Sequence, residues 1–153
     1  MTKASELLYI EDFDAVVALG QLMQLECEPS IPYNELEVRA NLFMCVNDLQ
    51  REAINMWIVK DNDRIVGFGV GQISKFLFSH ATKASLTLWF VLPEYRKTRA
   101  AFEILHNFEN WARLQSVIRT EVGVAKCNVD EAKHLNQMFT KRGFTRYGEL
   151  FYR

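Results

Sequence analysis

The segment that most constrains the fold lies between residues 88 and 101. The run Leu88-Trp89-Phe90-Val91-Leu92 has strand character, and Pro93 cannot continue a central strand. From Thr98 onward, apolar residues recur on one helical face, traced by Ala101, Leu105, Phe108, Ala112 and Gln115 and broadened by Ile104 and Trp111. A strand that passes through a tight turn into an amphipathic helix is typical of α/β sheet proteins.

The start of this helix has the properties of an anion site. The first N–H groups of a helix have no intrahelical acceptor, and they lie at the positive end of the helix dipole. Arg96, Lys97 and Arg99 add positive charge, and Thr98 adds a hydroxyl. This combination favours a phosphate or a pyrophosphate. The spacing fits equally well an ordinary strand-to-helix connection with solvated basic residues.

In the first half of the chain, the sequence pattern predicts a strand, two helices and a hairpin. The expected elements are a strand at 7–10, a helix capped by Asp12 or Asp14, a loop at 28–32 with two prolines, a helix with a capping box at Asn34 and Glu37, and strands at 56–60 and 64–74 around the turn 61–63. The apolar faces of the two helices are expected to be Phe13, Val16, Val17, Gly20 and Met23 in the first, and Leu36, Ala40, Phe43 and Val46 in the second.

The second half predicts alternating strands and helices. The expected elements are a loop at 76–83, a strand at 84–92, the helix from Thr98, a β-rich stretch at 117–126, a helix from Asn128 to the glycine stop at Gly143, and a closing strand or hairpin at 144–152. The tryptophans at 57, 89 and 111 fall mainly on apolar faces and are expected in the core. The element order predicts a mixed α/β sheet in one domain that spans residues 1–153.

Composition excludes several classes of function. The chain has 153 residues, of which 49% are hydrophobic, so it can bury one core. Its net charge of −1 argues against nucleic-acid binding through bulk electrostatics, which needs a strongly basic surface. The longest apolar stretch, 86–92, is too short to cross a membrane, and the first residues do not resemble a signal peptide. We therefore expect a cytoplasmic protein with no membrane partner.

The cysteines point to neither a disulfide framework nor a metal site. Cys27, Cys45 and Cys127 are odd in number and widely spaced, and they fit reduced thiols. No zinc-ligand spacing occurs, so no metal is expected.

Three blocks of the sequence resemble the GNAT N-acyltransferase superfamily. The acetyl-CoA motif of that family, V-x-P-x-[YF]-[RQ]-x-x-G-x-[GA], is matched by Val91, Pro93, Tyr95, Arg96 and Ala101. The block 135–144, Leu-Asn-Gln-Met-Phe-Thr-Lys-Arg-Gly-Phe, resembles the second conserved helix of the family, which ends in Gly-Phe. Residues 57–68 resemble its usual hairpin, and the motif loop is similar to that of small phage-encoded members. The resemblance covers nearly the whole chain.

This resemblance implies a fold and an activity. The fold would be a mixed, mostly antiparallel sheet splayed between two parallel strands, with helices on both faces. The activity would be transfer of an acetyl group from acetyl-CoA to a primary amine by direct attack. The pantetheine arm would lie along the strand at 87–92, facing the strand at 118–126, and the backbone N–H of Val91 would stabilise the oxyanion. The implied cofactor residues are Phe90, Val91, Leu92, Arg96, Lys97, Thr98, Arg99, Ala100, Ala101, Asn136 and Phe139.

Residues for the acceptor side are less well defined by the sequence. Glu121 is the candidate base because it lies on the strand expected opposite the acetyl group, although a strand glutamate equally fits a solvent-facing position. Glu28 and Tyr33 are candidate acceptor-binding residues, because the loop that contains them walls the acceptor side in this family. Their competing interpretation is plain surface-loop residues. The carboxylates of Glu26 and Glu28 would favour a cationic amine.

Two departures from the family pattern leave alternatives open. Arg99 stands where the family usually has glycine, and it either crowds the loop or donates to a phosphate. Phe139 replaces a tyrosine proposed to protonate the departing thiol, so water or another residue would supply that proton. The alternatives are a non-catalytic domain of this fold that binds CoA or a macromolecular partner, and an acyltransferase that acts on a protein or modified-nucleobase amine. The sequence also leaves open a homodimer.

Overall fold

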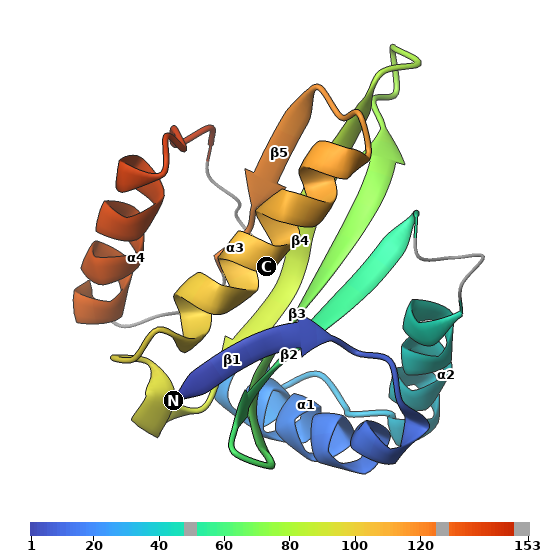
Figure 1. The fold of residues 1–153 in the computed structure, drawn as a ribbon, viewed down its shortest axis with the longest axis vertical. Helices are drawn as coiled ribbons and strands as arrows, with labels where there is room; N and C mark the ends of the chain where they lie inside the picture. Colours follow the sequence, from blue (N-terminus) through green and yellow to red (C-terminus); the bar gives the residue numbers. More distant parts are fainter. Residues whose placement is uncertain (48–51, 125–128, 149–153) are drawn as a thin grey trace. The chain divides into compact units, whose positions relative to one another are not determined.

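The computed structural model describes residues 1–47, 52–124 and 129–148 (Figure 1). The chain divides into two compact units, Met1–Gly123 and Val124–Arg153. The organisation of all 153 residues as one domain stays a prediction. No helix among the described residues combines the length and the apolar character that a membrane crossing requires.

The first unit is a sheet with helices on both faces, and this confirms the predicted fold class. Its elements are β1 (Thr2–Glu6), the 3-10 turn η1 (Ile10–Asp12), α1 (Phe13–Cys27), α2 (Glu35–Val46), β2 (Ile54–Asp61), β3 (Arg64–Lys75), β4 (Thr82–Val91), the 3-10 turn η2 (Pro93–Tyr95), α3 (Ala100–Leu114) and β5 (Arg119–Val122). The strands lie in the order β1-β2-β3-β4-β5, and all neighbours are antiparallel except β4 and β5, which are parallel.

Helix α3 lies across the sheet (Figure 1). It approaches β3 closely because glycines of that strand lie beneath it. A Cβ on Gly69 would overlap the γ2 methyl of Ile104, and a Cβ on Gly71 would lie 3.0 Å from Phe108, Trp111 and Trp57. Side chains alternate along a strand, so Phe68 faces the opposite side of the sheet, where α1 contacts β3. The close approach of α3 fixes the position of its first residues, which follow β4 after the segment 92–99.

The first strand was predicted wrongly at 7–10. The strand is Thr2–Glu6, in which only Ala4 is buried, and Leu7 ends it by donating its N–H to the carbonyl of Met56 at 2.8 Å. A strand at the edge of a sheet needs few apolar residues, so its polar sequence gives no hydrophobic signal. Tyr9 and Ile10 are exposed.

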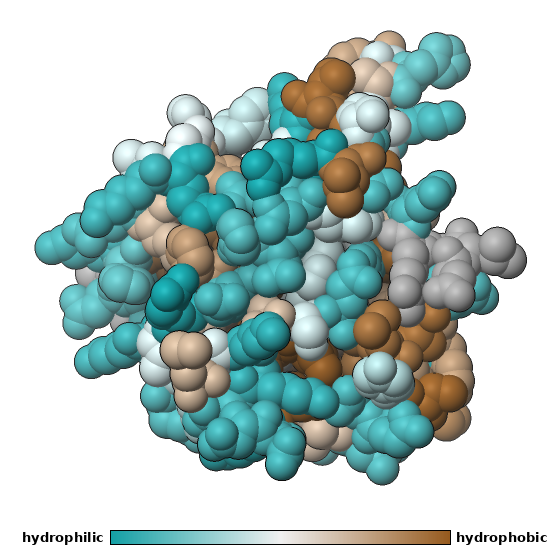
Figure 2. Space-filling view, in the orientation of Figure 1, coloured by the Kyte–Doolittle hydropathy of each residue, from teal (hydrophilic) through white to brown (hydrophobic). Residues whose placement is uncertain are grey.

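The two N-terminal helices were predicted correctly as elements, but one apolar face was not. The Asn34 side chain caps α2 by accepting a hydrogen bond from the N–H of Glu37 at 3.2 Å, as predicted. Leu36 and Phe43 are exposed, however, and Leu42 and Cys45 are buried instead. Apolar side chains occur around much of this helix, so periodicity alone could not select the buried face. The exposed ones appear in brown over α2 in Figure 2.

The remaining strands differ from prediction mainly in length. The β2–β3 hairpin is confirmed, with Asn62 at a φ of 53° in its turn. Strand β4 begins at Thr82 rather than at residue 84, and β5 covers only Arg119–Val122. Residues 144–148 have no regular secondary structure, so the closing strand is absent from that stretch, and residues 149–152 lie outside the described residues. Cys127 and the predicted cap Asn128 also lie outside them.

The second unit contains α4 (Val129–Lys141), which ends in a Schellman cap. Gly143 has a φ of +83°, a left-handed conformation that favours glycine, as the predicted glycine stop requires. The N–H of Phe144 donates to the carbonyl of Phe139 at 3.0 Å, and the two rings pack edge to face at 5.8 Å. The Gly-Phe pair and Phe139 therefore together terminate this helix.

Candidate active site

Strand β4 contains a bulge at Thr87. Gly71 pairs with Leu86 and Val70 pairs with Leu88, so Thr87 has no partner residue on β3. A bulge changes which edge the following backbone groups face. Beyond it, the N–H of Leu92 donates to Val66 of β3 at 2.9 Å. Because backbone groups alternate along a strand, the N–H groups of Trp89 and Val91 point to the other edge of β4.

That other edge is where β4 and β5 separate. Their parallel ladder runs from Lys83 opposite Arg119 to Leu86 opposite Val122, and no residue pair of the described chain extends it. The N–H of Gly123 makes a last bond to the carbonyl of Leu86 at 3.3 Å. We call residues 87–91 the open edge of β4. This separation of two parallel strands is the splay that the family resemblance implied.

The loop after β4 leads directly into the exposed start of α3. The Thr98 hydroxyl donates to the carbonyl of Tyr95 at 2.6 Å and accepts the N–H of Ala100 at 3.2 Å. The first intrahelical bond follows, from the N–H of Glu103 to the carbonyl of Arg99 at 2.9 Å. Lys97, Thr98 and Arg99 are exposed, whereas Ala100 is buried. This arrangement places the N-terminal end of α3 beside the exposed positive charges of Lys97 and Arg99, a combination that favours an anion.

Arg99 is accommodated without backbone strain. Its φ of −77° and ψ of −1° are right-handed helical values that any residue adopts. Its side chain is 73% exposed and extends along α3, with the guanidinium 5.3 Å from the centre of the Phe102 ring and 3.6 Å from the Glu103 carboxylate. The backbone conformation at this position therefore does not require the glycine that is usual in the family.

Arg96 links the end of β4 to the end of α1. Its Nε donates to the carbonyl of Val91 at 3.0 Å, and its Nη2 lies 2.7 Å from the carboxylate of Glu26 at the end of α1. The guanidinium also lies 5.4 Å from the centre of the Phe90 ring. The side chain is 22% exposed, so these contacts are partly shielded from water. A direct role of Arg96 in cofactor binding stays a prediction.

Tyr95 attaches the same loop to the β2–β3 turn. Its hydroxyl donates to Asp61 at 3.0 Å, and the Arg64 guanidinium lies 6.0 Å from the centre of its ring. The hydrogen bond from Tyr95 is the main reason that the pKa of Asp61 lies below its ordinary value. Asp61 was not singled out from the sequence, where it is one of several polar residues in a turn.

The predicted base, Glu121, lies next to the end of the β4–β5 ladder. Its carboxylate accepts hydrogen bonds from Lys83 at 2.8 Å and from Ser85 at 3.4 Å, and Arg119 is 3.6 Å away. The side chain is 29% exposed. Glu121 is therefore held by neighbouring cations rather than projecting into solvent.

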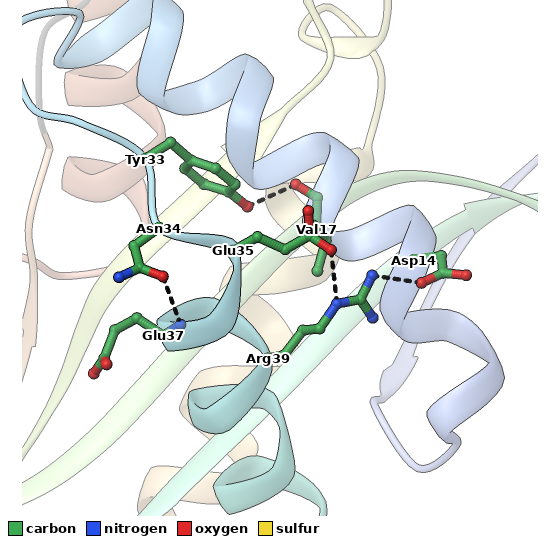
Figure 3. A network of polar contacts seen from close by, with 7 residues as sticks. All are labelled: Asp14, Val17, Tyr33, Asn34, Glu35, Glu37 and Arg39. Carbon is green, nitrogen blue, oxygen red and sulfur yellow. Dashed lines mark hydrogen bonds and ion pairs between the residues drawn. The ribbon is translucent and has the colours of Figure 1, made fainter.

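The predicted acceptor residues Glu28 and Tyr33 lie in the loop before α2, and Figure 3 shows Tyr33 with its contact to α1. Tyr33 donates its hydroxyl to the carbonyl of Val17 in α1 at 2.7 Å, over Gly20, whose Cβ would lie 2.8 Å from that hydroxyl. Burial, with a smaller contribution from Glu35, raises the pKa of Tyr33. The carbonyl of Glu28 accepts the N–H of Ile31 at 3.0 Å, and its carboxylate makes no hydrogen bond or ion pair with another described residue. Tyr33 thus fastens the loop to α1, and the Glu28 carboxylate is available.

Two predicted cofactor residues belong to the second unit. Asn136 and Phe139 are both on α4, where the carbonyl of Asn136 accepts the Thr140 hydroxyl at 2.8 Å. Phe139 has the capping role described above, and the cofactor role of both residues stays a prediction. Among the described residues, no three His, Cys, Asp or Glu side chains are placed to hold a metal ion.

The fold and the site define a class of protein: an α/β protein with two splayed parallel strands and a basic loop that opens a helix. The model of the Acetyltransferase (GNAT) family matches residues 19–144, and the chain belongs to that family. No curated protein matches the chain in sequence.

Solved structures share this fold over the whole chain. AAC(6')-Iy bound to a CoA-containing bisubstrate analogue superposes with a TM-score of 0.74 at 14% identity, covering 100% of this chain and 97% of that one. An aminoglycoside 6'-N-acetyltransferase from Acinetobacter baumannii gives 0.72 at 16% identity, with coverage of 100% and 97%. A predicted acetyltransferase with acetyl-CoA from Clostridium acetobutylicum gives 0.71 at 16% identity, with coverage of 100% and 96%. At these identities, the likeness concerns the fold.

Proposed function

We propose that the protein is an N-acetyltransferase that moves an acetyl group from acetyl-CoA to a primary amine by direct attack in a ternary complex. The observation that carries this proposal is the open edge of β4, with the N–H groups of Trp89 and Val91 turned toward it, next to the basic start of α3. Membership of the GNAT family supports the same activity.

The cofactor would occupy the two parts of this site in order. Its pyrophosphate would bind the N–H groups at the start of α3, with Lys97 and Arg99 as neighbouring cations. The pantetheine arm would then lie along the open edge and pair with its backbone as an added strand does. The N–H of Val91 would pair with the arm near its pyrophosphate end, and that of Trp89, farther along the edge, would donate to the thioester oxygen in place of the predicted Val91 and stabilise the oxyanion that forms there.

The chemical step needs a neutral amine. A free alkyl amine with a pKa of about 10.4 is mostly protonated at neutral pH, so a base that removes one proton would increase the reactive fraction. Glu121 is our candidate base, and it would act after release from Lys83. The amine nitrogen bonds to the thioester carbon and the C–S bond breaks. The proton that the nitrogen loses passes through water to the departing sulfur, because Phe139 has no hydroxyl to supply one.

A cationic amine is the acceptor class that we propose. The carboxylate of Glu28 is available in the loop before α2, whereas the second predicted carboxylate, that of Glu26, is already paired with Arg96. Structures with the same fold include enzymes named as aminoglycoside acetyltransferases. Aminoglycosides carry several amines, so they are suitable first probes.

The test is acetyl-CoA-dependent thiol release in the presence of sisomicin, neamine and a lysine-containing peptide, with mass spectrometry of each product. We expect release to depend on an amine and to give an acetylated product. Glu121→Gln should lower the rate and flatten its pH dependence, whereas Glu28→Gln should raise KM for the cationic acceptor. Binding of acetyl-CoA without turnover of any amine would contradict the proposal and favour a non-catalytic CoA-binding domain.

A further inference from the structure

Trp89 was expected to be a core residue, but it is only half-buried and bridges two strands. Its indole Nε1 donates to the carbonyl of Gly123, just beyond the end of β5, at 2.8 Å. This hydrogen bond lies just beyond the last backbone hydrogen bond between β4 and β5, in which the N–H of Gly123 donates to the carbonyl of Leu86. The indole thus spans the gap at the point where β4 and β5 separate.

The side chain of Trp89 lies on the α3 face of the sheet. Trp89 pairs with Gly69 of β3, and a Cβ on Gly69 would lie 3.6 Å from the Cβ of Trp89 and would overlap Ile104 of α3. The backbone N–H of the same residue points to the open edge. One residue therefore supplies both a hydrogen-bond donor at that edge and an aromatic surface across its closed end.

The direction of the proposed cofactor follows from the order of the elements. The basic loop that would hold the pyrophosphate comes after β4, at the end near Val91. The thioester end of the arm must then point back along the open edge toward Leu86, where the strands are paired. The acyl group, which is the far end of the arm, would approach the indole of Trp89.

We propose that Trp89 limits the acyl group to a short chain, so that acetyl-CoA is bound in preference to longer acyl-CoA esters. This inference rests on the proposed function, because it assumes that acyl-CoA lies along the open edge. An acetyl group ends before it reaches the residues where β4 and β5 are paired. A longer acyl chain has to displace the Trp89 indole and break its hydrogen bond to Gly123. In a closely packed site, each misfit methylene lowers affinity roughly 10- to 200-fold.

The test measures calorimetric dissociation constants for acetyl-CoA and hexanoyl-CoA. We expect the wild-type chain to bind acetyl-CoA at least about tenfold more tightly than hexanoyl-CoA. Trp89→Ala should reduce this preference to about threefold or less, chiefly through tighter binding of hexanoyl-CoA. Trp89→Phe keeps a ring but loses the bond to Gly123, and it should give an intermediate ratio.

Leu88→Ala is the matched control, because its side chain is on the opposite face of the same strand. It should keep the wild-type ratio. A chemical denaturation curve of each variant reports whether it is folded, and Trp89→Phe tests the inference if Trp89→Ala is not. An unchanged ratio in a folded Trp89 variant would overturn the inference and leave the proposed function standing. A wild-type chain that binds neither ester would overturn both.

Discussion

Replacement of Gly69 by alanine tests the packing that positions the candidate site. The added Cβ would overlap the γ2 methyl of Ile104, which is fully buried, and would lie 3.3 Å from Leu86 Cδ1. Overpacking of this kind costs about 1–3 kcal/mol. Alanine has less conformational freedom than glycine in the unfolded chain, and this stabilises the folded state by about 0.4–1 kcal/mol. We therefore expect a net loss of about 1–2 kcal/mol in the free energy of unfolding.

The assay is denaturant unfolding of Gly69→Ala beside the wild-type chain. Gly123→Ala is the control in the same unit, because the nearest atom to its Cβ would be the Leu86 carbonyl oxygen at an ordinary 3.8 Å. Its effect should stay within about 0.5 kcal/mol. Ile104→Leu removes the methyl from the β-carbon, so it should restore part of the stability in the Gly69→Ala background and not in the wild type.

The same substitution has a consequence for binding. Helix α3 begins at Ala100, one turn before Ile104, so a shift of the helix moves the loop that would hold the pyrophosphate. We expect weaker acetyl-CoA binding by Gly69→Ala even in conditions where it is fully folded. A Gly69→Ala variant as stable as the wild type would refute the argument that β3 and α3 pack at this distance.

Three other variants test separate contacts. Arg96→Ala should weaken calorimetric acetyl-CoA binding roughly tenfold, because the end of β4 loses its link to Glu26, and Arg96→Lys should not restore it; unchanged affinity would contradict this placement. Tyr95→Phe removes the bond that lowers the pKa of Asp61, and a carboxyl whose pKa is lowered on folding stabilises the protein above its unfolded pKa. The stability difference between wild type and Tyr95→Phe should therefore be complete at neutral pH and shrink below about pH 3.9, and a difference independent of pH would contradict it. Gly143→Ala places a side chain at a φ of +83° and should cost about 1–2 kcal/mol, seen as lost amide protection in α4; undiminished protection would count against the Schellman cap.

The sequence predicted the elements whose signals are local. Pro93 marked the end of β4, the spacing after Thr98 marked α3, and Asn34 and Gly143 marked a helix start and a helix stop. Each of these signals acts within a few residues, through backbone conformation or hydrogen bonding.

Contacts between distant segments could not be predicted in the same way. Glu26 is 70 residues from its partner Arg96, and Gly123 is 34 residues from Trp89. The bulge at Thr87 determines which edge of β4 the N–H of Trp89 faces. No glycine or proline marks that bulge in the sequence. A shift of one residue exchanges the two edges, so periodicity alone left the orientation of the open edge undetermined.

Calorimetric titration of the purified chain with acetyl-CoA tests the central claim most directly, with free CoA and ATP as controls. The account predicts saturable binding of one acetyl-CoA per chain in the micromolar range, comparable binding of CoA, and no binding of ATP under the same conditions. A folded, monodisperse sample that does not bind acetyl-CoA would contradict the assignment of the open edge of β4 and the start of α3 as a cofactor site.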